Sequence, residues 1–161
     1  MSVVYALATP PAKSAICVFR VSGDGCLDLF KNFVKYVPER ERFFYTKSFS
    51  FNGALIDRVG MVFFKGPKSY TGEDSVEIYA HGGLAVIKEI IRAFKSVGID
   101  EAGPGEFTKR AFLNDKLTLN EAESVLDLIN ASTKNEAFLS ASALSGDLSS
   151  ELNSFSDQIN N

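Results

Sequence analysis

The sequence predicts an α/β (α+β) protein in two parts: a sheet-and-helix domain over residues 1–118, and the first helices of an all-α domain over residues 119–161. Three observations lead to this prediction. Segments with the period-two alternation of β-strands recur as far as Ala80. A segment with helical periodicity follows them, from Leu84 to about Val97. Beyond residue 118, helix caps and apolar steps of three or four residues predict helices alone.

The composition agrees with a folded chain. Its 161 residues are enough for one compact domain and some additional structure. Apolar residues make up 45% and charged residues 23%, which is the usual balance of globular proteins. Aromatic residues reach 12%, and 14 of them are phenylalanine, which favours a packed core and argues against disorder.

Two strands are predicted at the start of the chain. The residues Ser2–Thr9 begin with β-branched and aromatic side chains, and Pro10-Pro11 ends this strand. The second strand covers Ile16–Val21, where alternation separates two faces. One face carries Ile16, Val18 and Arg20, and the other carries Cys17, Phe19 and Val21.

The next segment predicts a helix and then a hairpin. Ser22–Gly25 is a turn, and apolar spacing predicts a helix over Cys26–Val37 that Pro38 ends. Asn52-Gly53 joins the two strands of the hairpin, because both residues tolerate a positive φ. These strands cover Phe43–Phe51 and Leu55–Phe64.

A polar loop separates the hairpin from the last predicted strand. The loop covers Lys65–Asp74, and the strand covers Ser75–Ala80. His81-Gly82-Gly83 is predicted to be a tight turn into the helix that begins at Leu84. The buried side of this helix carries Val86, Ile87, Ile90, Ile91 and Phe94.

Only helices are predicted in the remainder. Gly103-Pro104-Gly105 opens a short helix over Glu106–Leu113, and a turn follows at Asn114-Asp115-Lys116. Capping boxes at Thr118–Glu121 and Thr133–Glu136 predict one helix start, and then a kink or a second helix. A narrow apolar stripe follows and needs a partner surface, so an open helical layer is expected. The stripe consists of Phe138, Ala141, Leu144, Leu148, Leu152, Phe155 and Ile159.

The net charge of −3 is unevenly distributed. Residues 1–118 carry 16 basic and 13 acidic side chains, whereas residues 119–161 carry 1 and 7. The last quarter of the chain is therefore a poor candidate for binding phosphates. No signal peptide and no membrane-spanning stretch is visible, so we expect a cytoplasmic protein.

The residue types exclude several kinds of chemistry. Cys17 and Cys26 fit neither a disulfide framework nor a zinc site, and we expect both to be buried. His81 is the single histidine and no nucleophile elbow occurs, which excludes catalytic triads and metal-dependent hydrolysis. The chain also lacks a phosphate-binding loop, so it should not hydrolyse GTP. No catalytic residue and no metal site is predicted.

The segment Thr71–Gly83 contains the most informative polar pattern. Alternation directs its apolar residues into the core and leaves Glu77 and Tyr79 on the opposite face. A carboxylate beside an aromatic ring suits a ligand with paired N–H donors, such as the 2-amino-4-oxo edge of a pterin or guanine. The alternative is a solvated strand face, or an ion pair of Glu77 with Arg20 or Arg58. The pattern alone leaves both interpretations open.

Three segments of the sequence match the motifs of one protein family. Residues 8–23 read ATPPAKSAICVFRVSG, where the family has ATPP, a link and a strand ending in R-x-S-G. Residues 66–83 read GPKSYTGEDSVEIYAHGG, and the family pattern is GP-x-S-[FY]-TGED-x-x-E-x-x-x-HGG. The longest match is GPGEFTKRAFLNDKLTLNEAESVLDLI at 103–129. Together the three cover a little over a third of the chain, and they resemble the tRNA-modification GTPase family MnmE, also called TrmE.

The resemblance implies a fold for each part. The first part is expected to be similar to the tetrahydrofolate-binding domain of the glycine-cleavage T protein. The remainder resembles the start of the helical domain of the family, into which a Ras-like G domain is inserted. That G domain, with its GTP, Mg²⁺ and K⁺, and the C-terminal helices are expected to be absent from this chain.

The resemblance also implies a function. Together with the flavoprotein MnmG (GidA), the family modifies the wobble uridine (U34) of tRNA, using a one-carbon unit from folate. Its N-terminal domain binds 5-formyltetrahydrofolate and forms a homodimer, and the folate contacts correspond here to Arg20, Glu77 and Lys116. Glu77 suits the N–H edge of the pterin, whereas Arg20 and Lys116 suit its anionic tail or carbonyl oxygens. The implied partners are a second copy of the chain, MnmG and, through the full complex, tRNA.

One segment departs from the family pattern. The link after the two prolines is usually glycine-rich, whereas here it reads Ala12-Lys13-Ser14-Ala15, and Cys17 stands where glycine is common. A link with fewer glycines is stiffer. The alternative function is therefore a structural dimerisation module that no longer binds folate.

Overall fold

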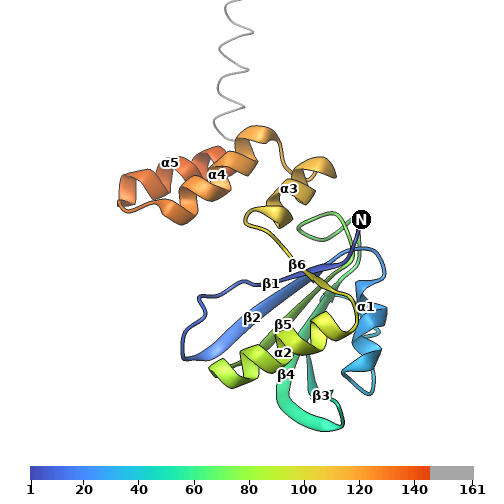
Figure 1. Cartoon of the computed structure of the whole chain (residues 1–161). Coiled ribbons are helices and arrows are strands. Elements are labelled where there is room, and N and C mark those ends of the chain that lie inside the picture. Colours follow the sequence, from blue (N-terminus) through green and yellow to red (C-terminus); the bar gives the residue numbers. More distant parts are fainter. Residues whose placement is uncertain (146–161) are drawn as a thin grey trace, which may run out of the picture. The chain divides into compact units, whose positions relative to one another are not determined.

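The computed structural model describes residues 1–145 and confirms the α/β class, with a six-stranded mixed sheet and helices (Figure 1). The chain divides into two compact units, of which the first is Met1–Phe107 and the second begins at Thr108. Helix α3 (Glu106–Leu113) spans this division. A domain boundary at residue 118 stays a prediction from the sequence.

The sheet of the first unit has the strand order β3-β4-β5-β2-β1-β6. Neighbouring strands are antiparallel, except that β1 and β6 are parallel. The first five strands lie where alternation predicts them, with ends shifted by a few residues, whereas β6 has only two residues and shows no periodicity. The strands are β1 (Val4–Leu7), β2 (Ser14–Ser22), β3 (Tyr45–Phe51), β4 (Ala54–Phe64), β5 (Ser75–Gly82) and β6 (Asp100–Glu101).

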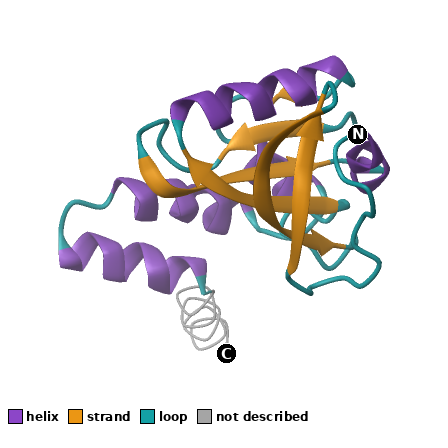
Figure 2. Ribbon diagram, turned by 90° about the horizontal axis from the view of Figure 1, so that it is seen from below, coloured by secondary structure: helices purple, strands orange, loops and turns teal. Residues whose placement is uncertain are grey.

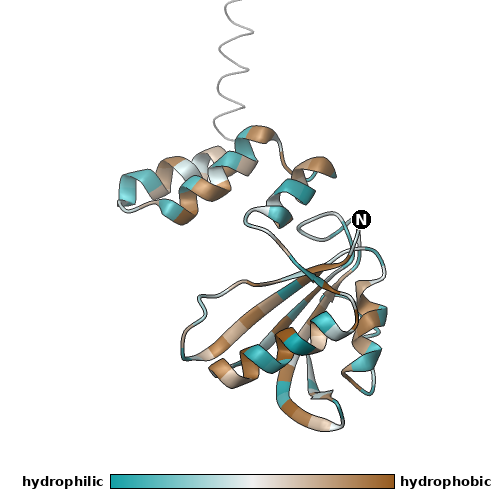
Figure 3. Ribbon diagram, viewed as in Figure 1, coloured by the Kyte–Doolittle hydropathy of each residue, from teal (hydrophilic) through white to brown (hydrophobic). Residues whose placement is uncertain are grey.

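Helix α2 (Leu84–Ser96) packs along one face of this sheet (Figures 1 and 2). Its residue Phe94 is fully buried, and five aromatic rings from the sheet and from the segment after β2 surround it at centroid distances of 5.1–6.2 Å. These rings belong to Tyr5, Phe19, Phe30, Phe33 and Phe49. The core is thus built around Phe94 of α2. Hydrophobic and hydrophilic residues alternate along this helix and along the strands that it covers (Figure 3).

The alternation of strands β2 and β5 agrees with the prediction. Cys17, Phe19 and Val21 are fully buried on the face that α2 covers, whereas Ile16 is 60% exposed on the other. Cys26 is fully buried as well, so both cysteines are core residues as expected. Arg20 and Glu77 therefore lie on the face of the sheet opposite α2.

The predicted helix over Cys26–Val37 is wrong in its length. Helix α1 covers only Cys26–Leu29 and continues as a 3-10 turn, η1 (Phe30–Asn32). The reason is tertiary: the carbonyl of Phe33 accepts a 2.8 Å hydrogen bond from the backbone N–H of Ser50 in β3, so it does not continue the helix. Phe30, Phe33 and Val34 are all buried without the remaining turns.

The two predicted turns around the middle strands have different outcomes. Asn52 and Gly53 join β3 to β4 with φ of 50° and 76°, as the hairpin pattern predicts. The predicted turn at His81-Gly82-Gly83 is narrower, because β5 continues through Gly82, which pairs with Ser14 of β2. Gly83 alone forms the N-cap of α2.

The second unit contains helices α4 (Leu119–Asn130) and α5 (Lys134–Leu144). Thr118 and Thr133 each form the predicted capping box, so the second signal marks a separate helix rather than a kink. Of the predicted stripe, Phe138, Ala141 and Leu144 lie in α5, and the rest falls outside the described residues. Within residues 1–145, no helix has the length and apolar character needed to cross a bilayer.

Candidate ligand site

The centre of the candidate site is an ion pair between the two inner strands. Arg20 of β2 stands opposite Glu77 of β5 in the sheet register. The carboxylate oxygen Oε1 of Glu77 accepts hydrogen bonds from Nε of Arg20 at 3.1 Å and from Nη2 at 2.7 Å. Both side chains are half-buried, with exposed fractions of 30% for Arg20 and 17% for Glu77.

The second oxygen of Glu77 is also engaged. Tyr79, two residues along β5, donates its hydroxyl to Oε2 of Glu77 at 2.7 Å. Burial, followed by this hydrogen bond and the negative charge of Glu77, raises the pKa of Tyr79 to about 12. The phenol thus remains a hydrogen-bond donor at neutral pH. The ring of Phe44 lies 5.7 Å from that of Tyr79.

Two aromatic rings lie beside the guanidinium group of Arg20. The Cζ atom of Arg20 lies over the ring of Tyr70 at 5.1 Å from its centroid, and over that of Phe107 at 5.7 Å. Both distances are within the range of cation–π attraction. The ion pair therefore has an aromatic surround that the alternation of β2 and β5 does not reveal.

The loop that carries Tyr70 is held by a buried polar network. The hydroxyl of Ser22 lies 2.7 Å from that of Thr71 and donates to Oε2 of Glu73 at 2.9 Å. Asp74 accepts from Nζ of Lys65 at 2.8 Å and from the backbone N–H of Gly66 at 3.0 Å, which ties the two ends of the loop together. Ser22, Thr71 and Glu73 are all buried.

A groove of about 590 Å³ opens at the edge of the sheet between β1, α2 and the segment after β6, and Arg20 is not among its lining residues. Two of its lining residues are neighbours of Arg20: Ala6 pairs with it across β1 and β2, and Phe107 lies beside its guanidinium group. The groove has the volume of a small-molecule site. Its other lining residues are Leu7, Thr9, Pro11, Ile87, Ile91 and the run Glu101–Gly105.

Lys116, the third predicted residue, belongs to the second unit. It follows α3 in the predicted turn, in which Asp115 has a φ of 53° and the backbone N–H of Lys116 donates to the carbonyl of Ala111 at 2.8 Å. The structure thus brings Arg20 and Glu77 together within the first unit. That Lys116 joins them stays a prediction.

A second pair of polar side chains, Asp57 and His81, lies at the far end of β5. Asp57 of β4 accepts from the backbone N–H of His81 and lies 2.8 Å from its ring atom Nδ1. Burial raises the pKa of Asp57, but hydrogen bonds from the backbone and ring of His81 and from the N–H of Arg58 outweigh it, so the pKa lies below its usual value. The side chain of His81 is 73% exposed, so this pair joins two strands rather than forming a cavity.

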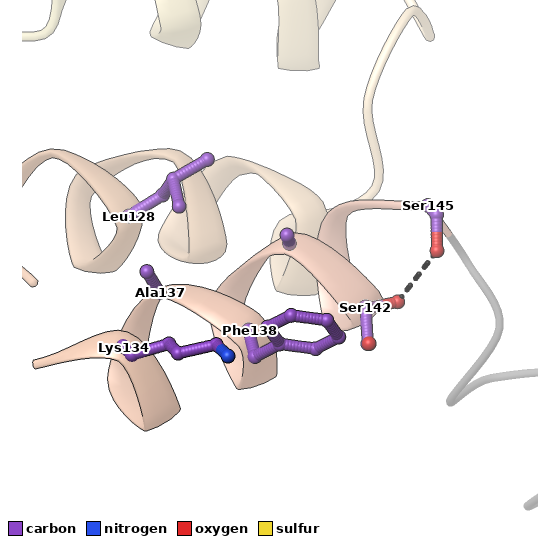
Figure 4. A pocket seen from close by; sticks show the side chains of 7 residues that line it. Leu128, Lys134, Ala137, Phe138, Ser142 and Ser145 are labelled. Atoms are coloured by element: carbon purple, nitrogen blue, oxygen red, sulfur yellow. Dashed lines mark hydrogen bonds between the residues drawn. The ribbon is translucent and has the colours of Figure 1, made fainter.

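The helical unit contains a further hollow, lined by α4, α5 and Ser145, of about 510 Å³ (Figure 4). Its lining is largely apolar, from Leu128, Ala137 and Phe138, and Lys134 lies at one end. It brings together no set of groups for binding or catalysis. Among residues 1–145, no cluster of three His, Cys, Asp or Glu side chains could hold a metal ion.

Chemically, the Arg20 site is suited to binding rather than to covalent reaction. The guanidinium group and the Tyr79 phenol are both donors, and the surrounding rings can contact a planar ligand. Sequence reasoning identified Arg20 and Glu77 but missed Tyr70 and Phe107. The signal for Tyr70 was its place in the Gly- and Pro-containing loop before β5, whereas nothing local marked Phe107.

These features define the class of the protein: an α/β domain with a polar cluster on the sheet face opposite its helix, followed by helices. The chain belongs to the family described as GTP-binding protein TrmE N-terminus, whose model matches residues 3–116.

Three relatives that cover nearly the whole chain carry the same name. The chain is 41% identical over 155 residues to the tRNA modification GTPase MnmE of Fervidobacterium nodosum, which covers 92% of this chain and 34% of the relative. It is 44% identical over 152 residues to MnmE of Thermotoga maritima, covering 92% of this chain and 33% of that protein. It is 38% identical over 159 residues to MnmE of Shewanella baltica, and this match covers 98% of this chain and 35% of that protein. The chain thus spans about a third of the length of the curated relatives that it matches.

Proposed function

We propose that this chain is the folate-binding and dimer-forming module of a GTPase that modifies the wobble uridine of tRNA together with MnmG in the cytoplasm. The module binds 5-formyltetrahydrofolate or a related one-carbon tetrahydrofolate and has no catalytic residues of its own. Membership of the TrmE N-terminal family and the name that the relatives share, tRNA modification GTPase, support the proposal.

The observation that carries the proposal is the Arg20–Glu77 pair. A charged pair on a sheet face, 30% and 17% exposed and joined to the hydroxyl of a half-buried tyrosine, is an unusual surface feature unless a ligand uses it. The groove at the edge of the same sheet, which shares Phe107 with the surroundings of Arg20, has room for a ligand with several rings. Arg20 offers donors for carbonyl or carboxylate oxygens, and Glu77 has one acceptor position left for an N–H group.

A titration of 5-formyltetrahydrofolate by calorimetry tests folate binding. Glu77→Ala should lose on the order of 2 kcal/mol of binding free energy, because a charge-assisted contact is lost. The matched control is Glu89→Ala, which removes a carboxylate from an exposed pair with Arg92 on α2. Wild-type binding that Glu77→Ala leaves unchanged would refute the site.

The second candidate is a structural dimerisation module without a ligand. One observation favours it: both oxygens of Glu77 already accept hydrogen bonds from Arg20 and Tyr79. Sedimentation velocity together with the titration separates the two. A dimer that binds folate supports the first candidate, a dimer that does not supports the second, and a monomer at high concentration contradicts both.

A further inference from the structure

The guanidinium group of Arg20 has a free edge. Its Nε and Nη2 both donate to one oxygen of Glu77, at 3.1 Å and 2.7 Å. A guanidinium group carries five N–H donors in a fixed plane, so the two on Nη1 point away from this pair. In the part of the chain that the structure describes, Nη1 donates to no group, and the side chain is 30% exposed.

Flanking rings restrict how that edge can turn. The guanidinium carbon lies over the rings of Tyr70 and Phe107, at 5.1 Å and 5.7 Å from their centroids. These rings come from separate segments, the loop before β5 and the start of α3. Cation–π contact fixes the position of a guanidinium group without using any of its N–H donors. Glu77 and the two rings therefore hold Arg20 by different groups and leave Nη1 available.

The loop network explains why Tyr70 can hold a position. Its neighbour Thr71 is fully buried, and the hydroxyl of Thr71 lies 2.7 Å from that of Ser22 at the end of β2. Arg20 lies two residues before Ser22 on the same strand. The loop is thus anchored to β2, the strand that carries Arg20. This anchor fixes the position of the Tyr70 ring relative to the guanidinium group.

From this geometry we infer that Tyr70 and Phe107 are positioning residues, which hold Arg20 so that its Nη1 edge meets an oxygen acceptor of the ligand. The inference rests on the proposed folate function. Two parts of a folate supply such oxygens: the carbonyl of the reduced pteridine with its formyl group, and the carboxylates of the glutamate tail. Both are oxygen acceptors that the Nη1 edge of a guanidinium group can bind, and two ligand probes separate them.

The first arm of the test needs no ligand. Ring currents shift protons that lie over an aromatic face, so the Nε–H resonance of Arg20 in a ¹⁵N spectrum reports the contact. Tyr70→Phe keeps the ring and should leave this resonance in place, whereas Tyr70→Leu should move it toward the position of a free arginine. Phe107→Tyr and Phe107→Leu form the matching second pair. If both leucine variants keep the folded spectrum and the wild-type Arg20 signal, the positioning role is wrong.

The second arm measures binding of two probes, 5-formyltetrahydrofolate and 5-formyl-6-methyltetrahydropterin, which keeps the formyl group and lacks the tail. Tyr70→Leu should weaken folate binding about tenfold, and Tyr70→Phe should restore it to within about twofold. Equal weakening for both probes assigns Arg20 to the pteridine oxygen, and weakening for folate alone assigns it to the tail. Folate binding that Tyr70→Leu leaves unchanged overturns the inference. A wild-type chain that binds neither probe overturns the proposed function, and the spectroscopic arm then decides the role of the rings by itself.

Discussion

Arg20 and Glu77 face each other across the paired strands β2 and β5, and Nη2 of Arg20 lies 2.7 Å from Oε1 of Glu77. They are 57 residues apart in the sequence, so the pair exists only because the strand register places them opposite each other. A shift of either strand by one residue would turn its member of the pair to the buried face and separate the two side chains. The pair is therefore a sensitive probe of the fold as well as of the site.

Removing one partner of this pair should destabilise the fold moderately. Glu77→Ala leaves a half-buried guanidinium group and the Tyr79 hydroxyl without their acceptor, so we expect a loss of about 1–2 kcal/mol in the free energy of unfolding by urea. The control Glu89→Ala breaks an exposed pair and should cost less than about 0.5 kcal/mol. Equal losses in the two variants would contradict the half-buried character of the site.

Stability should fall in strong alkali because of two phenols. Burial and Glu101 raise the pKa of Tyr5 to about 12, and burial and Glu77 raise that of Tyr79 to about 12. Since an unfolded tyrosine titrates near pH 10, each phenol stabilises the fold fully below pH 10, and this contribution is lost as the pH rises through about 12. We expect Tyr79→Phe to reduce the loss between pH 9 and pH 11 by on the order of 1 kcal/mol, measured by urea unfolding. A profile that both Tyr79→Phe and Tyr5→Phe leave unchanged would contradict these pKa values.

The stability of the fold at acidic pH should depend on Asp57. Its folded pKa lies below that of a free carboxyl, so its contribution is present above about pH 4 and is lost as the pH falls through the folded value. Its side chain is only 10% exposed and accepts hydrogen bonds from His81 and Arg58. Asp57→Ala should therefore cost about 2 kcal/mol at pH 7 in urea unfolding and flatten the stability profile between pH 5 and pH 3. His81→Ala should cost less, because the ring is 73% exposed and the backbone donor remains.

Phe94 should be the most sensitive position of the core. It is fully buried, and five rings surround it, so Phe94→Ala creates a cavity that rigid neighbours cannot fill. The free energy of unfolding, measured by heat or urea, should fall by about 3–5 kcal/mol. Ile91→Ala, on the partly buried side of the same helix, is the control and should cost clearly less. A loss below about 2 kcal/mol for Phe94→Ala would contradict this arrangement.

Local pattern predicted those parts of the fold in which local and tertiary preferences agree. The alternation of β2 and β5 gave the faces of Arg20 and Glu77, and the capping boxes at Thr118 and Thr133 gave the helix starts, because caps depend on three neighbouring residues. Helix α1 is shorter than its spacing predicts, since Ser50 of β3 binds the carbonyl of Phe33. The apolar spacing of residues 26–37 cannot indicate this hydrogen bond, because its donor lies on a strand that is distant in the sequence.

The aromatic surround of the site was hidden for a similar reason. Tyr70 and Phe107 reach Arg20 from a loop and from the start of α3, and no period in the sequence connects three such segments. The Arg20–Glu77 ion pair itself was one of the alternatives that the strand pattern left open. The strand pattern thus predicts that Arg20 and Glu77 share a face. That Tyr70 and Phe107 contact Arg20 depends on how the loops fold, which the pattern does not indicate.

Gly82 tests how tightly the end of the site strand is packed. A Cβ atom at Gly82 would lie 2.0 Å from Oγ and 2.7 Å from the backbone oxygen of Ser14, with which Gly82 pairs. A hydroxyl can rotate away but a backbone carbonyl cannot, so Gly82→Ala should separate β2 from β5 at this end and cost about 2 kcal/mol or more in urea unfolding. Gly103→Ala is the matched control, because nothing lies within 4 Å of its Cβ position, and it should be neutral or slightly stabilising. If Gly82→Ala is also neutral, β2 can move relative to β5, and the fixed opposition of Arg20 and Glu77 is not a property of the folded strand pair.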